Sequence, residues 1–125
     1  MSGITLDAGA LIAIDRDDRR VLALVSRTTE LGMRVTVPAT ALAQAMRNPA
    51  RQARLSRLIR QADTDLVALD CRDAAAVGLL LAQTRTTDIV DAHVAVCARR
   101  AEQAVATSDP GDIRRIAPDL DLVVV

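Results

Sequence analysis

Short, mainly apolar stretches alternate with longer segments of helical spacing along the chain, and this alternation restricts the possible folds more than any other feature. The short stretches are expected to be strands, and they cover residues 4–6, 34–37, 66–69, 104–107 and 122–125. Parallel strands need long crossover connections and are buried on both faces. The sequence therefore predicts an α/β fold, a three-layer α/β/α sandwich with a mostly parallel central sheet.

Helices are expected between these strands. They are predicted after Asp7, from Asp17 or Asp18 to about residue 31, from Pro38 to the Asn48-Pro49 pair, through the arginine-rich segment that follows, and over residues 72–83, 88–101 and 112–116. No linker or internal repeat interrupts this order, so residues 1–125 are predicted to form a single domain.

Several residue types are absent, and their absence excludes functions. The chain has no Phe, Trp or Tyr, which argues against a protein that stacks nucleic-acid bases on aromatic rings. It also has no lysine, which removes a P-loop nucleotide site and a phosphoacceptor receiver domain. Charged residues interrupt the apolar N-terminal stretch early, so neither a signal peptide nor a membrane span is expected, and the protein is predicted to be cytoplasmic.

The arginines follow a pattern that the net charge of zero hides. Residues Arg47, Arg51, Arg54, Arg57 and Arg60 are spaced three or four apart. On one continuous helix they would share a side, and such a surface suits a polyanion such as RNA, with Arg47, Arg51 and Arg54 as the expected contacts. A solvated arginine face paired with nearby acids explains the same spacing, and both interpretations stay open.

Aspartates gather where strands are expected to end. Asp88 and Asp91 lie one helical turn apart in an apolar run, Asp7 follows the first strand, and Asp109 follows the fourth. In parallel sheets the ligand site lies at the carboxyl ends of the strands, so these acids are expected to converge. All-oxygen ligation favours Mg2+ or Mn2+. The predicted metal ligands are Asp7, Asp91 and Asp109, with Asp88 as a further member.

Each of these residues also has a purely structural explanation. Asp7 and Asp88 are suitable helix N-caps, and the segment from Asp109 to Asp112 is a suitable turn. His93, the single histidine, is expected to form a local hydrogen bond within its helix, and Ser108 to support the site with its hydroxyl.

The two cysteines, Cys71 and Cys97, fit no zinc or disulfide pattern and are expected to be buried thiols.

Four segments together resemble the PIN-domain family, and in particular VapC-type toxin ribonucleases. They are ITLDAGALIA, VPATALAQAMR, TDIVDAHVAVCAR and VATSDPGDI, and their order and spacing cover nearly the whole chain. The resemblance implies an endoribonuclease with Asp7, Asp91 and Asp109 as metal-site acids and Asp88 and Asp112 nearby. It also implies Mg2+ or Mn2+ as cofactor, a homodimer, and a small cognate VapB-type antitoxin as partner.

The chain departs from the family pattern at Gln44, where the resemblance implies a glutamate. A glutamine offers a carbonyl oxygen without negative charge, so it can position a water or weakly ligate a metal. Weaker metal binding is the expected consequence. The alternative function is therefore a weakened or inactive PIN domain that binds RNA or a protein.

Overall fold

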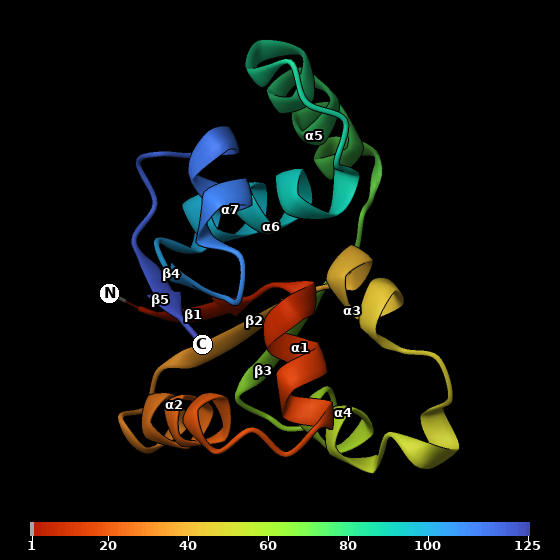
Figure 1. Cartoon of the computed structure of the whole chain (residues 1–125), viewed down its shortest axis with the longest axis vertical. Helices are drawn as coiled ribbons and strands as arrows, with labels where there is room; N and C mark the ends of the chain where they lie inside the picture. The colour runs from red at the N-terminus through yellow and green to blue at the C-terminus, as the bar shows by residue number, and fades with distance from the viewer. Residues whose placement is uncertain (1) are drawn as a thin grey trace.

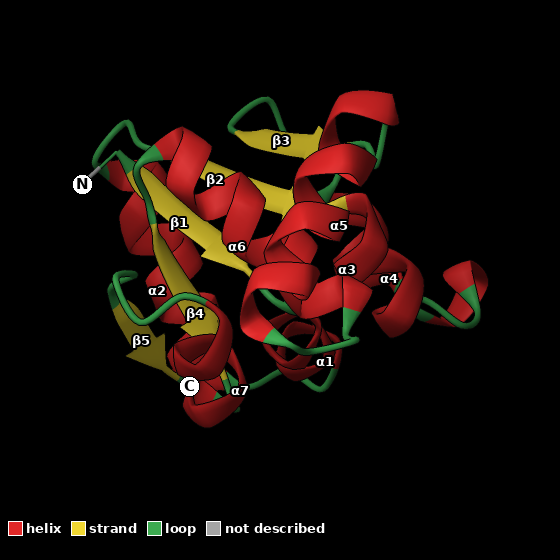
Figure 2. Ribbon diagram, turned by 90° about the horizontal axis from the view of Figure 1, so that it is seen from above, coloured by secondary structure: helices red, strands yellow, loops and turns green. Residues whose placement is uncertain are grey.

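The central sheet is entirely parallel. The computed structural model describes residues 2–125, with strands β1 (Gly3–Leu6), β2 (Arg34–Pro38), β3 (Thr64–Val67), β4 (Ala104–Thr107) and β5 (Leu122–Val124). Their order across the sheet is β3-β2-β1-β4-β5, and each neighbouring pair is parallel (Figure 2). The sequence prediction of a mostly parallel sheet is confirmed.

Helices cover both faces of this sheet. In chain order they are α1 (Ala8–Asp15), α2 (Arg19–Glu30), α3 (Ala39–Ala45), the short 3-10 turn η1 (Pro49–Arg51), α4 (Ala53–Leu58), α5 (Cys71–Thr84), α6 (Ile89–Ala101) and α7 (Pro110–Ile116). Helices α1, α2 and α4 lie on one side, and α6 and α7 lie on the other with α5 stacked outside them (Figure 1). This is the three-layer sandwich that the alternation predicts. Within residues 2–125 no helix is long and apolar enough to cross a bilayer.

The inner strands owe their burial to this double covering. Every residue of β1 and β4 is buried, and β2 is exposed only at Arg34. The edge strands behave differently, because only one neighbour and part of one face cover them. Val124 on β5 is 56% exposed, so the prediction of a buried final strand is wrong.

The third strand begins earlier than predicted. It covers Thr64–Val67 instead of residues 66–69, since its pairing with β2 starts at Val35 and Thr64. Asp65, on this edge strand, pairs with Arg34 at 2.6 Å. A charged residue inside a strand concealed the boundary from sequence reasoning.

The arginine-rich segment is not one continuous helix. Buried Gln52 interrupts it, because its side-chain oxygen accepts hydrogen bonds from the backbone N–H groups of Arg47 and Asn48 at 2.7 and 2.8 Å. The 3-10 turn ends at Arg51, and α4 covers only Ala53–Leu58. The predicted alignment of five arginines along one helix is therefore wrong.

Candidate metal site at the carboxyl ends of β1 and β4

The sheet order reverses direction at β1, whose two neighbours are β2 and β4. The chain leaves β1 into α1 on one face and leaves β4 toward α7 on the other (Figure 1). Such a switch point opens a crevice at the carboxyl ends of the strands, where α/β proteins bind ligands. Asp7 follows β1 directly and Asp109 lies two residues beyond β4, so both acids stand at this crevice.

Asp7 is buried and serves as the N-cap of α1. Its Oδ1 accepts a hydrogen bond of 2.8 Å from the Ala10 backbone N–H. Burial is the main cause that raises the pKa of Asp7, and the negative charge of Asp109 raises it further. The hydroxyl of Thr107 counteracts this rise as a hydrogen-bond donor. Thr107 also accepts a hydrogen bond of 2.9 Å from the Asp109 backbone, which connects the two acids through one side chain.

Asp91 is the acid whose pKa departs most from its ordinary value. Burial raises its pKa to about 7, and the negative charges of Asp88, Asp112, Asp7 and Asp109 each add to the rise. Four further carboxylates are thus close enough to repel one side chain. The acids predicted from the sequence do face a shared region.

The outer acids interact with one another. The pKa of Asp112 is raised, first because its carboxyl hydrogen-bonds with Asp109 and second because the charge of Asp109 is near. Arg115 lies 3.8 Å from Asp112 and partly offsets this charge. The exposed Asp109 therefore raises the pKa of both Asp7 and Asp112.

A hollow of about 390 Å³ opens beside these acids. Arg85, Thr86, Thr87, Asp88, Asp91, Asp112, Arg115 and Ile116 line it. The lining is mostly polar, and it combines three carboxylates with two guanidinium groups. This composition suits a charged ligand better than an apolar one.

The donor set fits a hard divalent cation. It consists of carboxylate oxygens, the ligands that Mg2+ and Mn2+ prefer. Within residues 2–125, however, no three of these acids bring oxygen atoms within 4.8 Å of one another. Mg2+ commonly uses one or two carboxylates and keeps several waters. The spacing therefore suits an ion held by few direct protein ligands.

Two residues predicted to support the site have different surroundings. Gln44 is exposed on α3, a helix that packs against α1 and α6, and no hydrogen bond joins its side chain to the acids in residues 2–125. Ser108 lies against Gly9, where an added Cβ would collide with the serine hydroxyl oxygen. Thr107 was missed. Its one sequence signal is a hydroxyl at the end of an apolar strand, two residues before Asp109.

The arginines predicted to bind RNA do not line the hollow beside the acids, and two of them contact other parts of the protein. Arg47 donates to the carbonyl oxygens of Ala43 and Met46, and Arg54 lies 3.4 Å from Asp17. Arg51 is exposed on the 3-10 turn.

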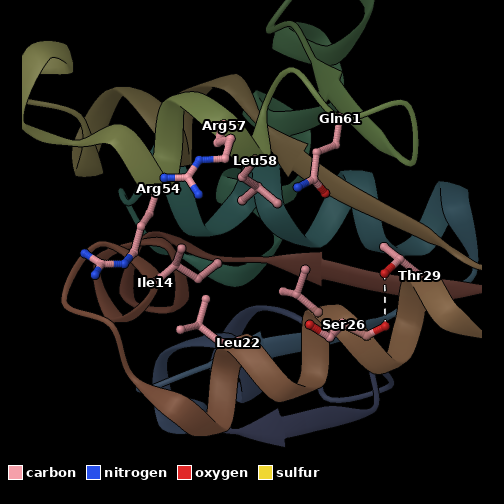
Figure 3. A pocket seen from close by; sticks show the side chains of 9 residues that line it. Ile14, Leu22, Ser26, Thr29, Arg54, Arg57, Leu58 and Gln61 are labelled. Atoms are coloured by element: carbon pink, nitrogen blue, oxygen red, sulfur yellow. Dashed lines mark hydrogen bonds between the residues drawn. The ribbon is translucent and has the colours of Figure 1, made fainter.

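A second hollow, of about 240 Å³, lies between α1, α2 and α4 (Figure 3). Ile14, Leu22, Val25 and Leu58 form its apolar wall, and Arg54 and Arg57 stand at its rim. It contains no carboxylate, so it does not offer a cation site.

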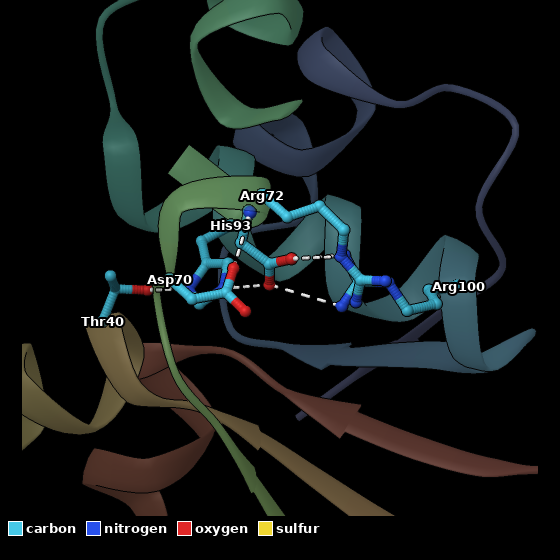
Figure 4. Close-up of polar contacts among 6 residues, drawn as sticks. Thr40, Asp70, Arg72, His93 and Arg100 are labelled. Atoms are coloured by element: carbon cyan, nitrogen blue, oxygen red, sulfur yellow. Dashed lines mark hydrogen bonds and ion pairs between the residues drawn. The ribbon is translucent and has the colours of Figure 1, made fainter. Parts of the chain in front are cut away.

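His93 belongs to a separate network, in which it and Asp73 are fully buried (Figure 4). Its Nε2 lies 3.1 Å from Asp73 on α5, and its Nδ1 lies 2.7 Å from the Thr40 hydroxyl on α3. Since an ionised carboxylate only accepts, Nε2 carries the proton and Nδ1 accepts from Thr40. These partners are 20 and 53 residues away in the chain. The predicted local hydrogen bond is wrong, and the histidine instead joins three helices.

Asp73, His93 and Cys97 place potential ligand atoms within 4.8 Å of one another. Arg100 already pairs with Asp73 at 2.5 Å, which is the main cause of the lowered pKa of that acid. Both ring nitrogens of His93 are also engaged, and burial raises the pKa of Cys97 to about 12. A satisfied network and a protonated thiol explain the cluster without a metal. Cys71 is exposed, contrary to the prediction that both thiols are buried.

One family model matches the chain, and several solved structures share its fold. The family model described as PIN domain matches residues 4–118. No curated protein matches the chain. Among solved structures, the chain resembles VapBC2 from Rickettsia felis bound to a DNA fragment from their promoter, with a TM-score of 0.72, 15% identity, and 98% of each chain covered.

Two further structures have similar folds. FitAcB from Neisseria gonorrhoeae gives a TM-score of 0.63 at 18% identity, with 95% of each chain covered. FitAB bound to an IR36 DNA fragment gives 0.65 at 16% identity, with 97% of this chain and 94% of that chain covered.

Proposed function

Because the chain belongs to the PIN-domain family, we propose that it is a Mg2+- or Mn2+-dependent endoribonuclease and the toxin of a type II toxin–antitoxin pair. The observation that carries this proposal is the gathering of other carboxylates around Asp91. Four other carboxylates repel this half-buried side chain and help to raise its pKa to about 7. A bound cation removes this repulsion, whereas a purely structural role does not require so many acids in one place.

In this proposal, Asp7, Asp91 and Asp109 surround the cation and hold it directly or through its waters, and Asp88 and Asp112 bind its waters or add negative charge. The cation, when bound, activates water and stabilises charge on the phosphoryl oxygens. Thr107 orients Asp7 and the Asp109 backbone. Gln44 and Ser108 are proposed to support the site by positioning water and the turn after β4.

The test is cleavage of RNA in Mn2+ by the wild type and by Asp7→Asn, with calorimetric titration of Mn2+ into both proteins. Asp63→Asn is the matched control, because Asp63 is exposed and lies in the turn before β3. We expect Asp7→Asn to lose cleavage and most Mn2+ binding, and the control to retain both. Cleavage that survives Asp7→Asn overturns the assignment of the site.

The alternative is a PIN domain that binds RNA or a protein without cutting. The observation that favours it is Gln44, which is exposed and supplies no charge to the acids. RNA binding by the wild type without cleavage in Mn2+ or Mg2+ would support this second function.

We further propose a VapB-type antitoxin as partner, a homodimer as the assembly and the cytoplasm as the location. The support for a partner is that the similar structures carry the names VapBC2, FitAcB and FitAB and contain promoter or IR36 DNA in two cases. Sedimentation that shows a monomer at tens of micromolar would overturn the dimer.

A further inference from the structure

We propose that Arg85 and Arg115 grip the phosphate next to the one that is cleaved, in an unpaired RNA strand that enters the hollow beside the acids. This inference rests on the proposed nuclease function and assigns the substrate contacts of that site. Both arginines line the same hollow as Asp88, Asp91 and Asp112. The negative charge of these acids repels the phosphate groups of an RNA strand that runs past the bound cation. The guanidinium groups of Arg85 and Arg115 offset this repulsion, because they lie at the same hollow and can bind a phosphate.

Arg85 is free to bind a ligand. It is exposed, and within residues 2–125 its side chain has no ion pair or hydrogen bond. It ends α5 in the left-handed conformation, with φ of 55° and ψ of 43°. Glycine is the residue that helices prefer at this kind of position. A cation at a helix C-terminus interacts favourably with the helix dipole, but this interaction leaves the guanidinium group of Arg85 free on the wall of the hollow.

Arg115 is held loosely. Its Nη1 lies 3.8 Å from Asp112, beyond direct hydrogen-bond distance, and both side chains are largely exposed. Exposed ion pairs of this kind contribute little to stability. A phosphate can therefore replace Asp112 as the partner of Arg115, particularly when a cation binds the acids.

Of the two threonines that line the hollow, Thr86 and Thr87, one has a hydroxyl group that is free to donate a hydrogen bond. Thr84 donates to the Leu80 carbonyl oxygen at 2.8 Å, so the 2.9 Å bond between Thr84 and Thr86 uses the Thr86 hydrogen. Thr87 is exposed and has no side-chain partner in residues 2–125. Its hydroxyl can donate to a phosphate oxygen or bond the ribose 2′-OH, the group that distinguishes RNA from DNA.

The expected mode of recognition is backbone contact with little base preference. The chain has no aromatic side chain on which a base could stack. Contacts to phosphate and sugar position a strand without reading its sequence. The hollow of about 390 Å³ between the 85–88 loop and α7 suits an unpaired nucleotide rather than a duplex.

The test measures binding of a fluorescent single-stranded RNA oligonucleotide in Ca2+ at several salt concentrations. We expect Arg85→Gly and Arg115→Ala each to weaken binding about five- to tenfold at low salt and to reduce the salt slope by about 0.7. Arg114→Ala is the matched control, because Arg114 is exposed on the same helix and does not line the hollow. It should bind as the wild type does.

Stability separates lost contact from misfolding. Glycine relieves the left-handed residue, so Arg85→Gly should melt at or above the wild-type temperature. Glu102→Gly is the second control, because Glu102 ends α6 with φ of 55° and does not line this hollow. It should show the same thermal effect and unchanged RNA binding.

Unchanged affinity and salt slope in both Arg85→Gly and Arg115→Ala overturn the proposal, as does a wild type that binds no RNA or binds a duplex more tightly. Cleavage in Mn2+ with unchanged KM in these variants overturns this inference and leaves the nuclease proposal intact. Arginine-dependent binding without any cleavage overturns the nuclease proposal and retains these contacts.

Discussion

The backbone N–H of Asp91 donates a hydrogen bond of 3.0 Å to the side chain of Asp88, while the two carboxylates repel each other. One pair of residues therefore both caps α6 and concentrates negative charge at its start. The cap fixes the position of Asp88 relative to Asp91, so the structural and functional interpretations of these acids are compatible. The same holds for Asp7, which caps α1 and faces the crevice.

The stability of the metal-free protein should depend on the protonation of Asp91. Its folded pKa of about 7 lies above the unfolded value of about 3.9. The folded state therefore binds the proton more tightly, and stability should fall as pH rises from about 4 to 7 and level off above. Asp91→Asn should melt higher than the wild type at pH 8 and show a flatter curve. Thermal melts in EDTA check this, and identical pH curves would contradict it.

Gln44→Glu should strengthen cation binding, because it adds a carboxylate on the helix packed against α1 and α6. We expect Mn2+ affinity to rise several-fold in calorimetry at pH 7.5, and RNA cleavage to rise with it. Gln61→Glu, an exposed glutamine beyond α4, is the control for added charge. Equal Mn2+ affinity in the wild type and Gln44→Glu would show that residue 44 lies outside the site.

His93→Ala should strongly destabilise the fold. It leaves the buried Asp73 carboxylate and the Thr40 hydroxyl without their ring partner, and such losses cost about 3 kcal/mol. Thr40→Val removes one neutral hydrogen bond and should cost only about 1 kcal/mol. Urea unfolding measures both. A loss below 1 kcal/mol for His93→Ala would show that Arg100 alone satisfies Asp73.

Gly9→Ala should disturb the site through a steric clash. The new methyl group meets the Ser108 hydroxyl oxygen, so this exposed side chain has to rotate, and the turn that carries Asp109 has to adjust to the tight contact with the Ser108 Cβ. We expect a loss of about 1–3 kcal/mol in stability and reduced cleavage. Adding Ser108→Ala removes the clashing oxygen and should recover much of both. A double variant no better than Gly9→Ala would contradict this explanation.

Arg51→Glu combined with Arg54→Glu tests the basic segment predicted from the sequence. If these side chains contact RNA, the double variant should bind more weakly and show a smaller salt slope. The fold should survive, because both side chains are exposed. An unchanged salt slope assigns the segment to the solvated face that the spacing also allows.

Local signals made the fold and the acids predictable. The parallel sheet follows from apolar stretches with helical crossovers, and the caps at Asp7, Asp18 and Asp88 follow from acids placed directly before helical patterns. Strand ends in a parallel sheet meet at one edge, so adjacency in sequence was enough to bring Asp7 and Asp109 together.

Features that depend on distant partners were not predictable. Gln52 interrupts the arginine segment only because its side chain turns back to Arg47 and Asn48. The partners of His93 lie on other helices. Arg85 adopts a left-handed conformation without the glycine that normally marks one. For Gln52 and His93 the deciding energy comes from contacts that local propensity does not include, whereas the turn at Arg85 is closed by backbone hydrogen bonds to the Leu81 carbonyl oxygen.

The position of His93 has a practical consequence for spectroscopy. The single imidazole, enclosed among α3, α5 and α6, gives one set of ring signals and one Nε2–H signal in nuclear magnetic resonance, with no overlap from other histidines or aromatic side chains. Solvent exchange of its Nε2 proton requires the contact with Asp73 to open. The Nε2–H resonance can therefore report how often α5 moves away from α6, without any label.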